Sequence, residues 1–128
     1  MSNRIVAAEL HPPPGYAHAA VTSGRLVFAA GAVPLDRDGK VVGRGDFAAQ
    51  ARQALDNLRV QLAAAGAAPA DVVKTTVYVV ATTMEELDLV WDVVLASDFV
   101  AAPSTLLGVT VLGYPGQLVE VEAIAAID

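Results

Sequence analysis

Two segments of the chain place apolar side chains at helical spacing, and both have recognisable ends. Between residues 46 and 65 the apolar positions fall three or four apart, as in one buried helical stripe: Phe47, Ala51, Ala54, Leu55, Leu58 and Leu62. Asp46 suits an N-cap, and Gly66 suits the first position after the helix. Thr83 is a fitting N-cap for a second helix over residues 84–97, with the stripe Leu87, Val90, Trp91, Val94 and Leu95. Each stripe predicts a helix with one face against an apolar layer.

Strands supply that layer. Residues 74–80, rich in Thr, Val and Tyr, predict a strand between the two helices. Residues 104–111 and 118–127 predict two more strands, joined by a turn at residues 113–116.

The region before the first helix also reads as strands and turns. Residues 17–22 and 25–30 flank Ser23-Gly24, a link of the kind that closes a β-hairpin. A turn is expected at residues 36–39, followed by a short edge strand at residues 40–42. The order ββ(β)αβαββ predicts an α+β fold, one domain over residues 1–128 with two helices on one face of a mixed sheet.

The composition places this domain among globular proteins. Of the 128 residues, 55% are hydrophobic and 17% are charged. Cysteine is absent, so neither disulfides nor thiolate metal ligation are expected, and a reducing, cytoplasmic setting fits. The few apolar residues ahead of Glu9 are too short for a signal sequence. The uncharged residues 99–119 are interrupted by Pro103, Pro115 and three glycines, so they predict strands and a turn and no membrane span.

The charges are divided unevenly along the chain. Residues 1–74 hold all eight Lys and Arg and six acids, whereas residues 75–128 hold eight acids and no Lys or Arg. The overall net charge is −6. Because binding to nucleic acid needs a basic face, no nucleic-acid partner is expected.

Two local patterns have ordinary structural explanations. Residues 43–48 match a G-x-G-x-x-A dinucleotide fingerprint, but Asp46 would put a carboxylate where the pyrophosphate must lie, so a Gly-rich turn and a helix cap are predicted. His11 and His18 are the only histidines and, without cysteine, make no convincing metal site. His18 lies beside Tyr16, either as a partly exposed surface histidine or at the edge of a site.

Glu120 and Glu122 are the most informative pair of residues. Side chains alternate along a strand, so both carboxylates point to one face, together with Leu118, Ile124 and Ala126. A partly desolvated carboxylate with no nearby cation suits a general base for water, and a solvent-exposed edge face is the alternative. Any cationic partner must come from residues 1–74 or from another subunit.

Five segments, taken in order and spacing, resemble the YjgF/RidA family of reactive-intermediate deaminases, and together they cover nearly the whole chain. They are Pro14-Gly15-Tyr16-Ala17-His18-Ala19, Phe28-Ala29-Ala30-Gly31-Ala32-Val33-Pro34, residues 50–58, residues 71–78 and residues 118–125.

This resemblance implies a chorismate-mutase-like α+β fold assembled as a homotrimer around a central barrel, with small-molecule clefts between subunits. It also implies hydrolysis of enamines and imines to ketoacids and ammonia, with no metal and no organic cofactor. By position, Tyr16 matches a tyrosine that lines the cleft, Gly31 a backbone contact, and Glu120 the acid that orients or deprotonates water.

The chain departs from the family at one substrate-binding position. The family's deaminases carry an arginine just before the penultimate strand, where it grips the substrate carboxylate, and here Ser104 stands at that position, followed by Thr105. A charge-assisted hydrogen bond to a carboxylate contributes about 1.5–3 kcal/mol, so efficient deamination of amino-acid-derived enamines is not expected.

Three functions remain open from the sequence. The first is hydrolysis of a neutral or differently charged imine or enamine, with Glu120 acting on water and Tyr16, Gly31, Ser104 and Thr105 contacting the substrate. The second is a non-catalytic trimer that binds or senses a small molecule. The third is a tailoring step in a biosynthetic pathway, in a bacterium whose genome the Ala, Val and Arg usage marks as GC-rich. The ribonuclease label attached to some family members fits poorly with the acidic charge.

Overall fold

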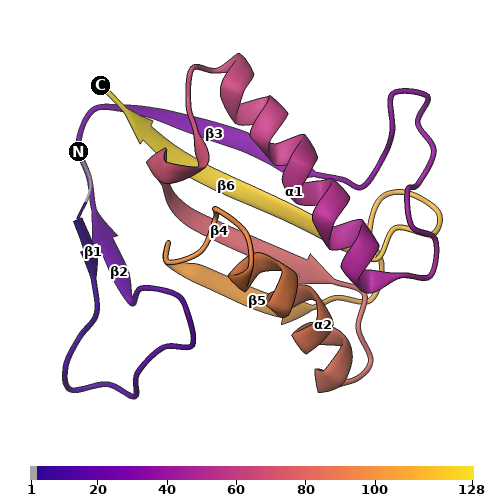
Figure 1. The fold of residues 1–128 in the computed structure, drawn as a ribbon, viewed down its shortest axis with the longest axis horizontal. Helices are drawn as coiled ribbons and strands as arrows, with labels where there is room; N and C mark the ends of the chain where they lie inside the picture. Colours follow the sequence, from indigo (N-terminus) through magenta and orange to yellow (C-terminus); the bar gives the residue numbers. More distant parts are fainter. Residues whose placement is uncertain (1–2) are drawn as a thin grey trace.

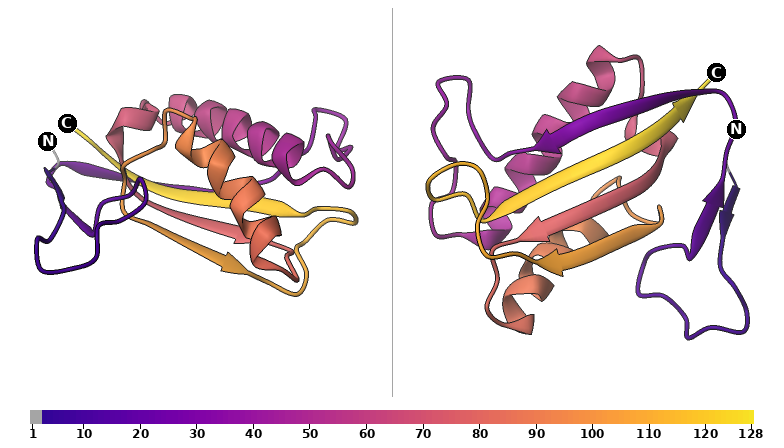
Figure 2. Two further views of the ribbon diagram at one scale, coloured as in Figure 1. Left: turned by 60° about the horizontal axis from the view of Figure 1, so that its bottom comes forward. Right: turned by 180° about the vertical axis from the view of Figure 1, so that it is seen from behind.

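The computed structural model describes residues 3–128 and contains a four-stranded mixed sheet covered on one face by two helices (Figure 1). The strands are β3 (Arg25–Ala32), β4 (Val72–Val79), β5 (Ser104–Gly108) and β6 (Val119–Ile127), in the spatial order β3-β6-β4-β5. β6 runs antiparallel to both of its neighbours, and β4 and β5 are parallel. The side view in Figure 2 shows the other face of the sheet without a helix. The predicted α+β architecture is therefore confirmed.

The first helix begins and ends where the sequence predicts. α1 (Phe47–Ala64) is capped by Asp46, whose carboxylate accepts a hydrogen bond from the Ala49 amide at 3.0 Å. Gly66 follows the helix with φ +82°, a left-handed conformation that glycine adopts without strain. Most of the predicted stripe is buried: Ala51, Ala54, Leu55, Leu58 and Leu62.

The second helix, α2 (Met84–Leu95), also starts at its predicted cap, because Thr83 accepts a hydrogen bond from the Glu86 amide. Only Val90 and Val94 are fully buried, whereas Leu95 is 36% exposed. The predicted stripe is wider than the buried one because α2 lies towards β5, at the edge of the sheet (Figure 1), where less apolar surface is available to cover it.

The strands alternate between the helix-covered face and the open face. On β4, Thr75, Val77 and Val79 are buried under the helices, and on β6 the odd-numbered residues from Val119 to Ala125 are buried in the same layer. The even-numbered residues of β6, and Lys74, Thr76 and Tyr78 of β4, point to the uncovered face, which is called the open face below. The parallel pairing of β4 and β5 needs a crossover, and α2 provides it.

The predicted hairpin between residues 17–22 and 25–30 is wrong for the single chain. β2 (Ala19–Val21) pairs with β1 (Asn3–Ile5), a strand that the sequence did not predict, and the two form a separate sheet beside the main one (Figures 1 and 2). Gly24 passes so close to the end of β6 that an added Cβ would overlap the Ile127 carbonyl oxygen. The link therefore carries the chain onward into β3 instead of reversing it.

The segment between β3 and α1 agrees with the prediction in part. The turn at residues 36–39 is present, with the Asp36 carboxylate accepting hydrogen bonds from the amides of Asp38 and Lys40 at 2.9 Å. The expected edge strand at residues 40–42 is wrong, because an isolated bridge between Leu35 and Val41 takes its place. The Gly-rich stretch ends at the Asp46 cap, as predicted.

Candidate functional site

Glu120 and Glu122 lie together on the open face of β6. Their neighbours Val119, Val121 and Ala123 are buried on the opposite face, so the alternation predicted from the sequence is confirmed. The two carboxylates are two residues apart on the same strand. The open face therefore presents a pair of acids near the middle of the sheet.

Gly31 and Glu120 are in direct proximity. Gly31 lies in β3 where the pairing with β6 shifts register between Ala29 and Ala32. A Cβ added to Gly31 would overlap Glu120 Oε2 and would lie 2.5 Å from its Cδ and 2.8 Å from its Cγ. The carboxylate of Glu120 thus occupies the space that any other residue at position 31 would fill.

Gln117 holds the other oxygen of Glu120. Its amide nitrogen donates to Glu120 Oε1 at 3.1 Å and to the Val119 carbonyl at 3.1 Å, and its amide oxygen accepts from the Tyr114 amide at 3.2 Å. Gln117 is 4% exposed, so its side chain is fixed. The carboxylate of Glu120 is therefore oriented by a neutral donor.

Tyr78 provides the partner of Glu122. It lies directly opposite Glu120 on β4, and its hydroxyl donates to the Glu122 carboxylate. That hydrogen bond, together with partial burial and the negative charges of Glu122 and Glu120, raises the pKa of Tyr78 above its ordinary value. The partners that the single chain gives these acids are neutral, and Gln117 and Tyr78 come from the same half of the chain as the acids. That a cationic partner would come from residues 1–74 or from another subunit stays a prediction.

The structure separates Ser104 from Thr105. The Ser104 hydroxyl accepts from the hydroxyl of Thr75, which is 2% exposed under the helices. Thr105 lies one residue later on β5 and so points to the open face, where its hydroxyl accepts from the Lys74 ammonium at 2.7 Å. Of these two predicted residues, Thr105 shares a face with Glu120, and it lies two strands away.

Tyr16 is the predicted site residue that the single chain keeps apart. Its ring contacts the rings of Trp91 and His18, each with centroids 6.2 Å apart in edge-to-face geometry. The adjoining Gly15 is bound to the segment after α2, because its carbonyl accepts from the Ala101 amide at 2.9 Å. His18 accepts a hydrogen bond from the Ala7 amide, so it fastens the N-terminal segment in this structure.

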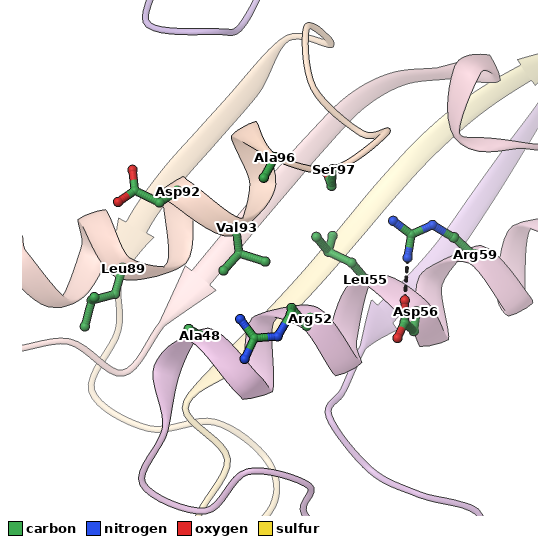
Figure 3. Close-up of a pocket in the computed structure, with 10 residues that line it drawn as sticks. All are labelled: Ala48, Arg52, Leu55, Asp56, Arg59, Leu89, Asp92, Val93, Ala96 and Ser97. Carbon is green, nitrogen blue, oxygen red and sulfur yellow. Dashed lines mark hydrogen bonds and ion pairs between the residues drawn. The ribbon is translucent and has the colours of Figure 1, made fainter.

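Two of the molecule's hollows lie on opposite sides of the sheet, and a third, beside Gly31, lies between the end of β3 and α1. A pocket of about 240 Å³ on the open face includes Phe28, Lys74, Thr76, Glu122 and Ile124 in its lining. A groove of about 510 Å³ runs between α1 and α2 (Figure 3). Its lining holds none of the predicted site residues.

Arg59, one of the cations that line the helix groove, has two acidic partners. Arg59 is bound to Asp56 at 2.6 Å, an interaction visible in Figure 3, and to Asp98 at 2.5 Å. The ion pair with Asp98 holds α1 to the segment after α2, and Leu55, at the floor of the groove, is buried in the core. Both features stabilise the helix layer. The candidate chemistry of the chain therefore lies on the open face of the sheet.

Sequence reasoning missed Gln117, Tyr78 and Gln50. Gln50 is fully buried in α1, where its amide nitrogen donates to the carbonyls of Gly43 and Gly116 and its amide oxygen accepts from the Leu118 amide at 2.7 Å. A glutamine within an apolar helical stripe is the signal that could have found it, because a buried amide needs partners.

The arrangement of two helices over one face of a mixed sheet, with an acid next to a glycine on the other face, defines a class. It is the chorismate-mutase-like α+β fold of RidA proteins. Residues 6–127 match the family described as Endoribonuclease L-PSP, and the chain belongs to this YjgF/RidA family. Within residues 3–128, no helix combines the length and apolar character needed to cross a membrane.

Curated relatives match over part of their length. A RutC family protein of Pyrococcus horikoshii is 40% identical over 76 residues, covering 58% of this chain and 60% of the relative. The 2-iminobutanoate/2-iminopropanoate deaminase of Escherichia coli is 43% identical over 60 residues, covering 46% of this chain and 45% of that enzyme. The matches thus span less than two thirds of these relatives.

Solved structures match over nearly the full length. YyfB from Yersinia pestis, a Rid family protein of unknown function, superposes with a TM-score of 0.91 at 36% identity and 98% coverage of both chains. The YjgF gene product of E. coli gives a TM-score of 0.68 at 29% identity, covering 97% of this chain and 93% of that chain. Five further family structures cover 97–99% of this chain with TM-scores of 0.66–0.71.

Proposed function

We propose that this protein hydrolyses an imine or enamine, with Glu120 holding and deprotonating the attacking water. The observation that carries the proposal is the fixed carboxylate of Glu120. Gln117 binds its Oε1, and its Oε2 lies against Gly31, where no side chain is present. Within residues 3–128 no Lys or Arg forms an ion pair with this carboxylate, so it is available as a proton acceptor.

The proposed reaction needs no group beyond the substrate and water. Water adds to the carbon of the C=N bond while Glu120 takes one of its protons, and the nitrogen receives a proton to become an amine. Collapse of this intermediate breaks the C–N bond, forms a carbonyl compound and releases ammonia. An enamine first tautomerises to the imine by moving a proton from nitrogen to carbon. The nitrogen takes its first proton from solvent, and the hydroxyl group of the intermediate releases one proton to solvent as the carbonyl forms. Glu120 returns its own proton to the departing nitrogen, so the site ends as it began.

The relatives support the reaction class. One of them bears the name 2-iminobutanoate/2-iminopropanoate deaminase, although the match covers less than half of that enzyme. The fold match extends over the whole chain, and Gly31 and Glu120 lie side by side within it.

The substrate that we propose is neutral, or is charged differently from the substrates of that deaminase. Ser104 and Thr105 offer hydroxyl groups where the family resemblance implies an arginine. The nearest cation is Lys74, a single ammonium already bound to Thr105, and it cannot form the two parallel hydrogen bonds that a guanidinium gives a carboxylate. Glu120 and Glu122 on the same face would also repel a carboxylate.

We further propose that the site works in a homotrimer with clefts between subunits, as the family resemblance implies. The open face carries exposed apolar side chains that an assembly would cover, including Phe28 at 71% and Leu26 at 50% exposure. A trimer that binds its ligand without turnover is the second candidate, and it is favoured by Ser104, which stands where the family resemblance implies an arginine.

An assay with two kinds of imine tests the proposal. An amine oxidase acting on an uncharged amine supplies a neutral imine, and a serine or threonine dehydratase supplies a carboxylate-bearing one. We expect the wild-type protein to release carbonyl product faster from the neutral imine than from the carboxylate-bearing one. Glu120→Gln should lose this acceleration, and the exposed control Glu85→Gln should keep it. Ligand-induced thermal stabilisation without multiple turnover would favour the binding protein instead.

A further inference from the structure

Two strands that are adjacent in the sequence each leave one edge unpaired. β3 is bonded to β6 along one side, and β2 is bonded to β1 along one side; within residues 3–128 neither has a second strand partner. Figure 1 shows β1 and β2 set apart from the main sheet. An unpaired edge is a ready template for a strand from another chain, because its N–H and C=O groups lack partners.

The free edge of β3 has little of the usual protection against pairing before its register shift at residues 29–32. The strand reads Arg-Leu-Val-Phe-Ala-Ala-Gly-Ala, so its one charged residue is the first, and it contains no lysine or proline. Leu26 and Phe28 are 50% and 71% exposed, and Val21 on β2 is 60% exposed. Both edges therefore carry apolar side chains that a partner strand would shield.

The two edges are complementary in register. Antiparallel pairing around a two-residue Ser23-Gly24 link sets Val21 opposite Leu26 and Ala19 opposite Phe28, because each step back along one strand is a step forward along the other. Continued past Ala29, where β3 shifts its register against β6, this pairing carries Tyr16 towards Gly31. The residue that the single chain keeps away from the candidate site thus falls beside it.

Contacts at both ends keep β2 away from β3 of its own chain. Gly24 is packed against the Ile127 carbonyl, and the Arg25 side chain donates to the Asp128 carbonyl at 2.7 Å. On the other side, the Pro14 carbonyl accepts from the Trp91 indole at 3.1 Å, and Gly15 is bound to Ala101. Closing the hairpin within one chain would require breaking the contacts of Pro14 and Gly15 with Trp91 and Ala101.

The structural comparisons fit an open hairpin. YyfB superposes with a TM-score of 0.91, whereas two other family structures that also cover nearly the whole chain give 0.66 and 0.68. A displaced hairpin lowers the TM-score of a superposition, because its residues no longer overlap. The aligned share of the chain stays complete, because the order of the elements is unchanged. A hairpin displaced from the main sheet in both this chain and YyfB would produce this contrast.

We propose that β2 of one copy pairs with the β3 edge of a second copy, so that the β1–β2 hairpin is exchanged between subunits. The contact is head-to-tail, and such a contact repeated around an axis closes a ring. The exchange brings Tyr16 of one copy next to Gly31 and Glu120 of the next, and the site is complete only in the assembly. The part played by Tyr16 rests on the proposed function, whereas the strand pairing does not.

Disulfide trapping tests the pairing without any activity assay. The chain has no cysteine, so Val21→Cys and Leu26→Cys can be introduced in separate variants, refolded together and oxidised. Opposite residues of antiparallel strands lie about 4.5–5.5 Å apart between Cα atoms, within the range of a disulfide. We expect a covalent dimer on a non-reducing gel, and none when Val21→Cys is mixed with Val60→Cys, a 68% exposed position on α1.

Two other results would overturn the exchange. A double variant Val21→Cys/Leu26→Cys that forms only a disulfide within one chain, with no dimer from the mixed single variants, would mean that the hairpin closes on its own chain. No disulfide in either experiment would mean that β2 and β3 do not pair in this register.

Complementation tests the consequence for the site. Tyr16→Phe and Glu120→Gln, each of low activity alone, should regain turnover when refolded together, because some sites then combine Tyr16 of one copy with Glu120 of another. Efficient disulfide trapping without regained turnover would contradict the shared site and leave the strand exchange standing.

Discussion

Glu120 rests its Oε2 oxygen against the backbone of Gly31, in the space that the Cβ of any other residue would occupy. This relationship joins β6 to β3 across a register shift and fixes where the carboxylate can be. Gln117 holds the second oxygen, so a single conformation of Glu120 satisfies both contacts.

Gly31→Ala should displace this carboxylate and lower turnover by about tenfold to a hundredfold, since a shift of about 1 Å in a catalytic group has effects of that size. Steady-state turnover of the neutral imine checks this. Gly113→Ala is the matched control, because an added Cβ at Gly113 meets no atom within 4 Å. Equal losses in both variants would show that the contact has no special role.

Gln117→Leu should destabilise the fold by about 1–3 kcal/mol, because it leaves the Tyr114 amide and the carbonyl of the buried Val119 without their side-chain partner. It should also reduce turnover, since Glu120 loses its orienting donor. Urea denaturation measures the first effect. Gln61→Leu, which removes an exposed hydrogen bond to the Ala30 carbonyl, should change the free energy of unfolding by less than about 0.5 kcal/mol.

The raised pKa of Tyr78 predicts a pH dependence of stability. The protonated hydroxyl donates to Glu122 in the folded protein, so this contribution is fully present below the ordinary tyrosine pKa of 10.0 and is lost as the pH rises through the higher folded value. Absorbance titration should therefore show one tyrosine that ionises late. Tyr78→Phe should abolish that late phase, and an unchanged titration would refute the assignment.

Restoring an arginine should work at one position and fail at its neighbour. Thr105→Arg places the guanidinium on the open face with Glu120, and we expect it to raise turnover of the carboxylate-bearing imine. Ser104→Arg directs the same group towards Thr75 under the helices, where an unpaired charge lowers stability. Thermal melts and the dehydratase-coupled assay separate the two effects. Gain of turnover in Ser104→Arg alone would reverse this assignment.

The predicted core can be tested at two positions on α1. Leu58 is fully buried, so Leu58→Ala should lower the free energy of unfolding by about 2–5 kcal/mol. Val60, two residues later, is 68% exposed, and Val60→Ala should change the free energy of unfolding by less than about 0.5 kcal/mol. Similar losses from both variants would contradict the placement of the helix.

Much of the fold could be predicted because the signals are local. Asp46 and Thr83 cap their helices, and the alternation along residues 119–125 places Glu120 on the right face, since each feature depends on a few neighbouring residues. The predicted hairpin at Ser23-Gly24 was wrong because its outcome depends on distant contacts. The packing of Gly24 against Ile127 is one such contact, and no local pattern reveals it.

The candidate site could also be predicted only in part. The proximity of Gly31 and Glu120 followed from the family resemblance, whereas their orientation depends on Gln117, which stands in an ordinary turn sequence. The separation of Ser104 and Thr105 required the pairing of β5 with β4. Tyr16 lies apart because α2 holds its segment, and α2 is distant in sequence.

The most direct test of the proposed function compares the turnover of a neutral imine by the wild-type protein and by Glu120→Gln. Thermal melts of the two proteins should first show that the variant is as stable as the wild type. We predict multiple turnovers by the wild type and at least a hundredfold lower rate in the variant, the size of effect that a general base contributes. Equal rates in the two proteins would contradict the role of Glu120.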